Sequence, residues 1–144
     1  MTIRPRSLKA VHVARTRLRD LASAGLSQAQ ADAGAAHAAA ATATAELDRT
    51  LDDCRRRMNA ASITGLIRIS AEVETHRAEA TQAAAASAQA AIAAREASEA
   101  LARRERELRT VDRAIELALN VTEELRAADE QRQSDDLNGR RRWP

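Results

Sequence analysis

The two prolines of this 144-residue chain, Pro5 and Pro144, lie at its extremes. Proline removes a backbone donor and clashes with the preceding helical turn, so its absence in between permits very long helices. The apolar 44% of the chain is mostly alanine, and 31% is charged. Trp143 is the only aromatic residue, whereas a packed globular core normally relies on several aromatics. The composition is typical of long Ala-, Glu-, Arg- and Leu-rich helices.

Two stretches of the chain carry small and apolar residues at alternating spacings of three and four, as the seam between packed helices requires. The first consists of Thr44, Leu47, Leu51, Cys54, Met58 and Ala61. The second consists of Ala97, Leu101, Arg104, Leu108, Val111, Ile115, Ala118, Thr122 and Leu125, and it is imperfect at the charged Arg104, whose head group would have to reach out of the seam. Leucines and valines near the start extend the first: Leu8, Val11, Leu18 and Leu21. We predict one helix over about 7–60, a second over about 66–137, and a flexible basic tail, 138–144.

Turn-forming and β-branched residues cluster in "NAASITGLIRIS", residues 59–70. Gly65 offers a permissive backbone, and Ser62 or Thr64 could cap the returning helix. A chain that folds back near Thr64 brings residue i opposite residue j where i and j sum to about 128. The alanine-rich segments 29–45 and 83–97 fit this rule, because their centres sum to 127. We therefore predict an all-α fold: one long antiparallel two-helix coiled-coil hairpin over residues 1–144, with an alanine-rich middle and a turn near residues 59–66.

Charge is distributed unevenly, although the net charge is only +2. Residues 1–20 carry six basic residues and one acidic residue, whereas residues 114–136 carry two basic and seven acidic residues. The fold-back rule places residues 4–19 opposite 109–124, where the acidic run begins. The two segments at the open end of the hairpin are thus electrostatically complementary.

Motifs for catalysis or cofactor binding are not found. The sequence contains no GxxxxGK[ST], GxGxxG or GxSxG, and His12, His37 and His76 lack metal-ligand spacing. Cys54 is either a small seam residue, which we favour, or a reactive thiol beside three arginines. We expect no enzyme activity, cofactor or metal.

Nucleic-acid binding and membrane insertion are also not expected. The basic runs "CRRRM" and "GRRRWP" are short, follow paired aspartates and lack stacking aromatics. The best apolar window is alanine-dominated and too short to cross a bilayer. The N-terminus lacks the apolar core of a secretory signal, and a single cysteine fits a reducing compartment. We expect a cytoplasmic protein.

Two zones remain as candidate contact sites. Large aliphatic residues gather at the tip of the hairpin, where they either close its end or form an exposed docking patch: Ile63, Leu66, Ile67 and Ile69. Arginines gather at the open end, together with the lone tryptophan: Arg4, Arg6, Arg15, Arg17, Arg19, Arg140, Arg141, Arg142 and Trp143. Arginine and tryptophan are preferred anchors of protein interfaces.

The start "RSLKAVHVARTRLRDL" and the ending "EELRAADEQRQSDDLNGRRRW" accompany a single hairpin of small size. In these features the chain resembles the stalk family of the type III secretion and flagellar export apparatus (the FliJ/YscO/SctO type). In that family the C-terminal helix often closes with a Glu/Gln-Asp-rich stretch followed by basic residues, similar to "ADEQRQSDDLNGRRR".

The resemblance implies a bacterial, non-enzymatic stalk that inserts into the export ATPase ring, raises its ATP turnover, contacts the cytoplasmic domain of the export gate and binds secretion chaperones. It also implies a position peripheral to the inner-membrane export apparatus. On this hypothesis the arginine-rich open end contacts the ATPase and the aliphatic tip contacts the gate. The alternatives are a general coiled-coil adaptor, a phasin-like granule-surface protein or a desiccation-type helical protein. Self-association is a further alternative, because exposed faces of an alanine-rich hairpin can pair.

Overall fold

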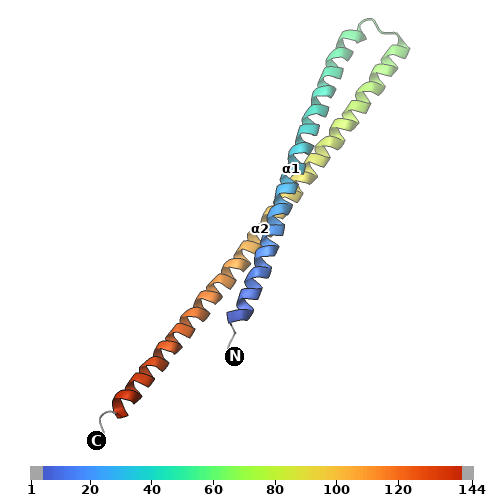
Figure 1. Cartoon of the computed structure of the whole chain (residues 1–144). Coiled ribbons are helices and arrows are strands. Elements are labelled where there is room, and N and C mark those ends of the chain that lie inside the picture. Colours follow the sequence, from blue (N-terminus) through green and yellow to red (C-terminus); the bar gives the residue numbers. More distant parts are fainter. Residues whose placement is uncertain (1–4, 141–144) are drawn as a thin grey trace. The chain divides into compact units, whose positions relative to one another are not determined.

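Two long helices make up the computed structural model of the chain (Figure 1). Helix α1 spans Pro5–Met58 and helix α2 spans Ile63–Arg140, with a turn at residues 59–62. The structure describes the backbone of residues 5–140 and the side chains of residues 7–136. Over this range it contains no strand, and the two helices pack against each other. The predicted all-α helical hairpin is confirmed.

The chain forms two compact units, and each helix contributes to both. Unit 1 contains residues 5–21 and 102–140 of the described chain, and unit 2 contains residues 22–101. Within each unit a stretch of α1 packs against an antiparallel stretch of α2. The units differ in what fills the seam between the helices, so each is described separately.

Alanine dominates the seam of unit 2. On α1 the residues at the seam spacing are half-buried, apart from the buried cysteine: Ala22, Leu26, Ala29, Ala33, Ala36, Ala40, Ala43, Leu47, Thr50 and Cys54. On α2 the corresponding residues are half-buried apart from the buried isoleucine: Ile69, Val73, His76, Ala80, Ala83, Ser87, Ala90, Ala94, Ala97 and Leu101. Small side chains let two helices approach closely but bury little area per residue. Of the predicted α1 seam, Thr44 and Met58 are wrong, because both are exposed.

The turn is capped by Ser62. Its carbonyl accepts the first helical bond of α2 from the Leu66 amide, at 2.9 Å, and its hydroxyl accepts a bond from the Gly65 amide, at 3.3 Å. Ser62 is therefore the N-cap, and α2 begins at Ile63 rather than near residue 66. The predicted role of Gly65 as a permissive backbone position is wrong, because no described glycine has a positive φ. A Cβ atom there would lie 3.4 Å from the Ala61 Cβ atom, so Gly65 provides space beside the turn.

Cys54 and Ile69, at the turn end of unit 2, are the buried residues of the described chain, 4% and 9% exposed. Arg57 lies beside them and joins three groups. Its Nε atom is 2.9 Å from an Asp53 oxygen, and its Nη2 atom donates to Glu72 across the seam at 3.1 Å and to the Cys54 sulfur at 3.9 Å. The hydrogen bond to Glu72 holds the pKa of Arg57 above its ordinary value. Cys54 is thus a packed seam residue, as favoured from the sequence.

The seam of unit 1 differs because α1 fills it with polar side chains. The half-buried α1 residues at the seam spacing are Leu8, His12, Arg15 and Arg19. They face the predicted α2 seam, which is half-buried from Arg104 through Thr122. Val11, Leu18 and Leu21, which we expected to extend the apolar seam, are exposed. The prediction for Leu125 is also wrong, since this side chain is exposed beyond the start of α1.

Candidate functional site

Polar pairs hold the two helices together in unit 1. Arg15 is hydrogen-bonded to Glu107, and Arg104 Nη1 donates to the same Glu107 oxygen at 3.0 Å. His12 Nδ1 lies 2.8 Å from Asp112 Oδ1. These five residues all lie on or beside the seam. Unit 1 therefore pairs its helices through polar contacts as well as through half-buried apolar residues such as Leu108 and Ile115.

The register of unit 1 differs from the fold-back rule. Near the turn, Arg57 pairs with Glu72, and the two residue numbers sum to 129, close to the predicted 128. In unit 1 the sums are 122 for Arg15 with Glu107 and 124 for His12 with Asp112. The predicted pairing of residues 4–19 with 109–124 is therefore shifted by four to six residues, which is between one and two helical turns. The rule counts residues from a turn that belongs to unit 2, whereas the pairs within unit 1 follow a local register of their own.

The pKa of Glu107 is shifted by its two arginine neighbours. The hydrogen bond from Arg104, helped by the positive charge of Arg15, holds the pKa of Glu107 below its ordinary value of 4.5 and outweighs partial desolvation. A carboxylate with a lowered folded-state pKa stabilises the fold fully above its unfolded-state pKa. That stabilisation is lost as the pH falls through the folded-state value.

We expect Glu107→Gln to lower the thermal midpoint of the protein at neutral pH and to flatten its decline below about pH 4.5. Glutamine cannot form the two charge-assisted contacts, so the part of the acid sensitivity due to Glu107 disappears. Circular dichroism melts across this pH range measure the effect. Glu96→Gln, at an exposed position of unit 2, controls for the loss of one carboxylate. Equal changes in both variants would contradict the role of Glu107.

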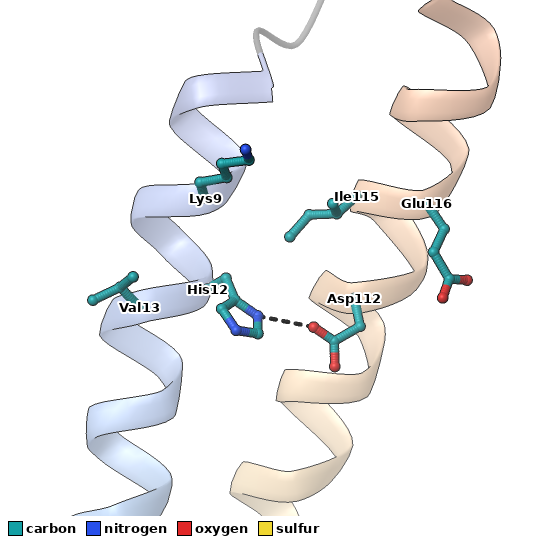
Figure 2. A pocket seen from close by; sticks show the side chains of 6 residues that line it. All are labelled: Lys9, His12, Val13, Asp112, Ile115 and Glu116. Carbon is teal, nitrogen blue, oxygen red and sulfur yellow. Dashed lines mark ion pairs between the residues drawn. The ribbon is translucent and has the colours of Figure 1, made fainter. Parts of the chain in front are cut away.

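An open groove of about 590 Å³ lies between the helices of unit 1. Its lining residues are Lys9, His12, Val13, Asp112, Ile115 and Glu116 (Figure 2). His12 and Asp112 point toward each other across the groove, and Ile115 points from α2 toward α1. The enclosed His12 Nδ1 atom makes no hydrogen bond of ordinary geometry within the described chain, despite its short distance to Asp112. Four of the six lining residues are polar or charged, but most of the surface that lines the groove is apolar. The groove lies on one side of the seam.

Large aliphatic side chains lie on the other side of the seam. Val11 and Leu18 each come one residue before a seam residue of α1, whereas Lys9, which lines the groove, comes one residue after a seam residue. In a heptad these two positions lie on opposite sides of the seam, so Val11 and Leu18 lie on the side away from the groove. Val121 occupies the equivalent place on α2. Leu21 and Leu117 lie one position further out on the same side. All five side chains are exposed, and we call them the apolar face: Val11, Leu18, Leu21, Leu117 and Val121.

Helix α2 continues past the start of α1 (Figure 1). With pair sums of 122 and 124, α1 starting at Pro5 reaches only to about residue 119 of α2. We call residues 120–136 the overhang. All its side chains are exposed except the half-buried Thr122. The overhang carries six acidic residues and two arginines, a net charge of −4: Glu123, Glu124, Arg126, Asp129, Glu130, Arg132, Asp135 and Asp136.

The tip of the hairpin exposes three of its four predicted aliphatic residues. Ile63 and Ile67 are 79% and 67% exposed, and Leu66 is also exposed. Ile69 is buried, so its predicted place in a contact patch is wrong. Ile69 closes the end of the seam, and the first turn of α2 turns the other three outward. Met58, exposed at the end of α1, joins them in what we call the tip patch.

The arginines predicted at the open end have different surroundings. Arg15 is half-buried against Glu107, Arg19 is half-buried and donates from Nε to Asp20 at 3.0 Å, and Arg17 is exposed. Side chains of the remaining predicted residues lie outside the described ones: Arg4, Arg6, Arg140, Arg141, Arg142 and Trp143. The sequence interpretation missed Lys9, Glu107 and Asp112. Acidic residues beside the α2 seam, opposite basic residues at the α1 seam spacing, were the signal for the last two.

Comparisons with known proteins identify no relative of this chain, so its function has to be argued from its own surfaces. No protein-family model, curated protein or solved structure matches the chain. Among the described residues no group of three or more His, Cys, Asp or Glu side chains could hold a metal ion. None of the helices, over its described length, is apolar enough to traverse a lipid bilayer. The candidate sites are the basic α1 segment of unit 1, the apolar face, the overhang and the tip patch.

Proposed function

We propose that the protein is a non-enzymatic stalk of a type III protein export apparatus, which binds the export ATPase ring and raises its turnover. The observation that carries this proposal is the position of the large side chains. Two residues are buried in the described chain, whereas five large aliphatics on one side of unit 1 and three at the tip are exposed. A chain that leaves clusters of large apolar residues exposed outside its own seam is suited to binding other proteins.

The basic segment of α1 is the proposed ATPase contact. Residues 7–21 carry four basic residues and one aspartate, a net charge of +3. Lys9 and Arg17 are exposed, while Arg15 and Arg19 engage acidic neighbours of their own chain. Exposed charges of one sign accelerate association with a surface of the opposite sign. Lys9 and Arg17 are therefore the residues we assign to the first encounter with an acidic surface of the ATPase.

The tip patch is the proposed contact for the export gate or for substrate chaperones. Met58, Ile63, Leu66 and Ile67 expose apolar surface around one helical turn and the end of α1. Apolar side chains at helical spacing fit a hydrophobic groove on a partner. The proposal places the protein in the cytoplasm at the inner-membrane export apparatus.

Binding to the purified cognate export ATPase tests the proposal. We expect co-elution of the wild-type protein with the ATPase, and an affinity about tenfold lower for Lys9→Glu with Arg17→Glu, since two favourable charges become repulsive. Arg15 is left unchanged, because a glutamate there would face Glu107 and disturb the seam.

The matched control is Arg49→Glu with Arg95→Glu, two exposed arginines of unit 2, which should bind like the wild type. Binding should also weaken with added salt, because the exposed charges are screened. Equal losses in both double variants, or no co-elution of the wild type, would exclude the proposed contact.

A further inference from the structure

We infer that unit 1 is also a self-association site, in which the overhang of each copy packs along the basic α1 segment and the apolar face of a second copy. The inference rests on the geometry of unit 1, and it uses the same basic α1 segment that the proposed function assigns to the ATPase. It assigns a partner to the overhang.

Among the residues that the structure describes, the overhang has no packing partner in its own chain. Most helical stability in proteins comes from packing of one face rather than from intrinsic propensity. Contacts within the overhang are local and exposed, such as Arg132 with Asp129 at 3.6 Å and Gln131 with Asp135 at 3.0 Å. Such pairs contribute little. Val121 and Leu125 are exposed along the same helix, so it offers an apolar stripe as well as charge.

Charge selects the second copy as the partner. The overhang carries −4 and α1 residues 7–21 carry +3. The two segments cannot satisfy each other within one chain, because α1 begins at Pro5 and reaches α2 only to about residue 119. In a two-fold pair, the overhang of each copy meets the basic segment of the other. This exchange is reciprocal and closes after two copies.

The apolar residues support the same arrangement. Val11 and Leu18 lie on the opposite side of the α1 seam from Lys9, and Val121 and Leu125 lie on the overhang that would cover them. Lys9 therefore adds to the positive charge of the segment and takes no part in this apolar contact. Packing them together removes apolar surface from water at both ends of the pair. Charge then fixes which segments meet, since two overhangs or two basic segments repel each other.

Light scattering and sedimentation on the full chain test the inference. We expect a mass twice the 15.6 kDa of one chain at micromolar concentration, with at least tenfold weaker association at high salt. Two charge-reversed variants sharpen the test. One is Glu123→Lys, Glu124→Lys and Glu130→Lys in the overhang, and the other is Lys9→Glu with Arg17→Glu in α1. Each alone should be monomeric, because both of its contact segments then carry the same sign.

An equimolar mixture of the two variants should restore a heterodimer, since the reversed overhang of one meets the reversed α1 of the other. Circular dichroism checks that each variant remains helical. The control Glu46→Lys, Asp48→Lys and Glu96→Lys changes exposed acids of unit 2 and should dimerise like the wild type. A monomeric wild type, or a mixture that stays monomeric, would overturn the inference.

The outcome is separable from that of the proposed function. A wild-type monomer that binds the ATPase would exclude self-association alone. If the wild type dimerises and the mixed charge-reversed variants form a heterodimer, but the protein leaves ATPase turnover unchanged, only the proposed function is excluded.

Discussion

Replacing Ile69 with alanine should lower the free energy of unfolding by about 2 kcal/mol, the lower end of the range for truncating a buried isoleucine. Ile69 is 9% exposed and, with Cys54, forms the buried end of the unit 2 seam. The alanine-rich seam beyond it buries little area per residue, so this end holds a large share of the apolar packing. Urea denaturation followed by circular dichroism measures the loss.

Ile67→Ala is the matched control for this prediction. Ile67 lies two residues before Ile69 in the same helix, but it is 67% exposed. Its truncation removes the same atoms with no cavity, and the expected change is within about 0.5 kcal/mol. Equal losses for the two variants would mean that Ile69 is not packed as the structure shows.

Replacing Gly25 and Gly34 together with alanine should raise the free energy of unfolding by about 2 kcal/mol. Both glycines lie inside α1, and neither has a positive φ. A Cβ atom at either position meets nothing within 4 Å. Glycine in a helix interior costs about 1 kcal/mol relative to alanine, because more backbone freedom is lost on folding.

Gly65→Ala, measured in the same way, separates the gain in helix propensity from the effect of limited space for an added Cβ atom. Gly65 also lies in a helix, but its added Cβ atom would be 3.4 Å from Ala61 Cβ and 3.5 Å from the Ser62 hydroxyl that caps α2. We expect a smaller gain there than at Gly25 or Gly34. If the double variant gains nothing, α1 is not a continuous helix through residues 25–34.

The fold was predictable because the seam spacing and the position of the turn are local properties of the sequence. Alternating steps of three and four identified the α2 seam through Thr122, and the absence of internal proline allowed helices of 54 and 78 residues. Ser62 was recognised as a possible cap because of its residue type. Gly65 was misinterpreted, because glycine signals both backbone freedom and missing side-chain volume, and only the latter applies.

The phase of α1 in unit 1 could not be predicted from apolar spacing alone. Val11, Leu18 and Leu21 have a helical spacing of their own, and burial of apolar residues is the usual expectation. In the structure, His12 and Arg15 instead face α2, where His12 lies beside Asp112 and Arg15 contacts Glu107. The inward stripe of α1 is the one that carries the contacts of Arg15 with Glu107 and of His12 with Asp112, and the apolar face stays exposed.

The candidate sites were predicted unevenly for the same reason. The sequence left open whether the tip aliphatics close the hairpin end or form an exposed patch. The turn aims the first residues of α2 outward, so Ile63 and Ile67 are exposed. Ile69 belongs to the same sequence cluster, but it lies two residues after Ile67 in α2 and therefore faces the seam, where it is buried. The overhang emerged only from the unit 1 register, because it depends on where α1 begins relative to α2.

The rate of ATP hydrolysis by the purified export ATPase, measured with increasing amounts of this protein, tests the central claim most directly. The account predicts that hydrolysis rises and saturates with the wild type and with Arg49→Glu, Arg95→Glu. It predicts that Lys9→Glu, Arg17→Glu requires about tenfold more protein for the same rise. An unchanged rate at concentrations that saturate any binding would contradict the proposal that the protein is a stimulating stalk of the export ATPase.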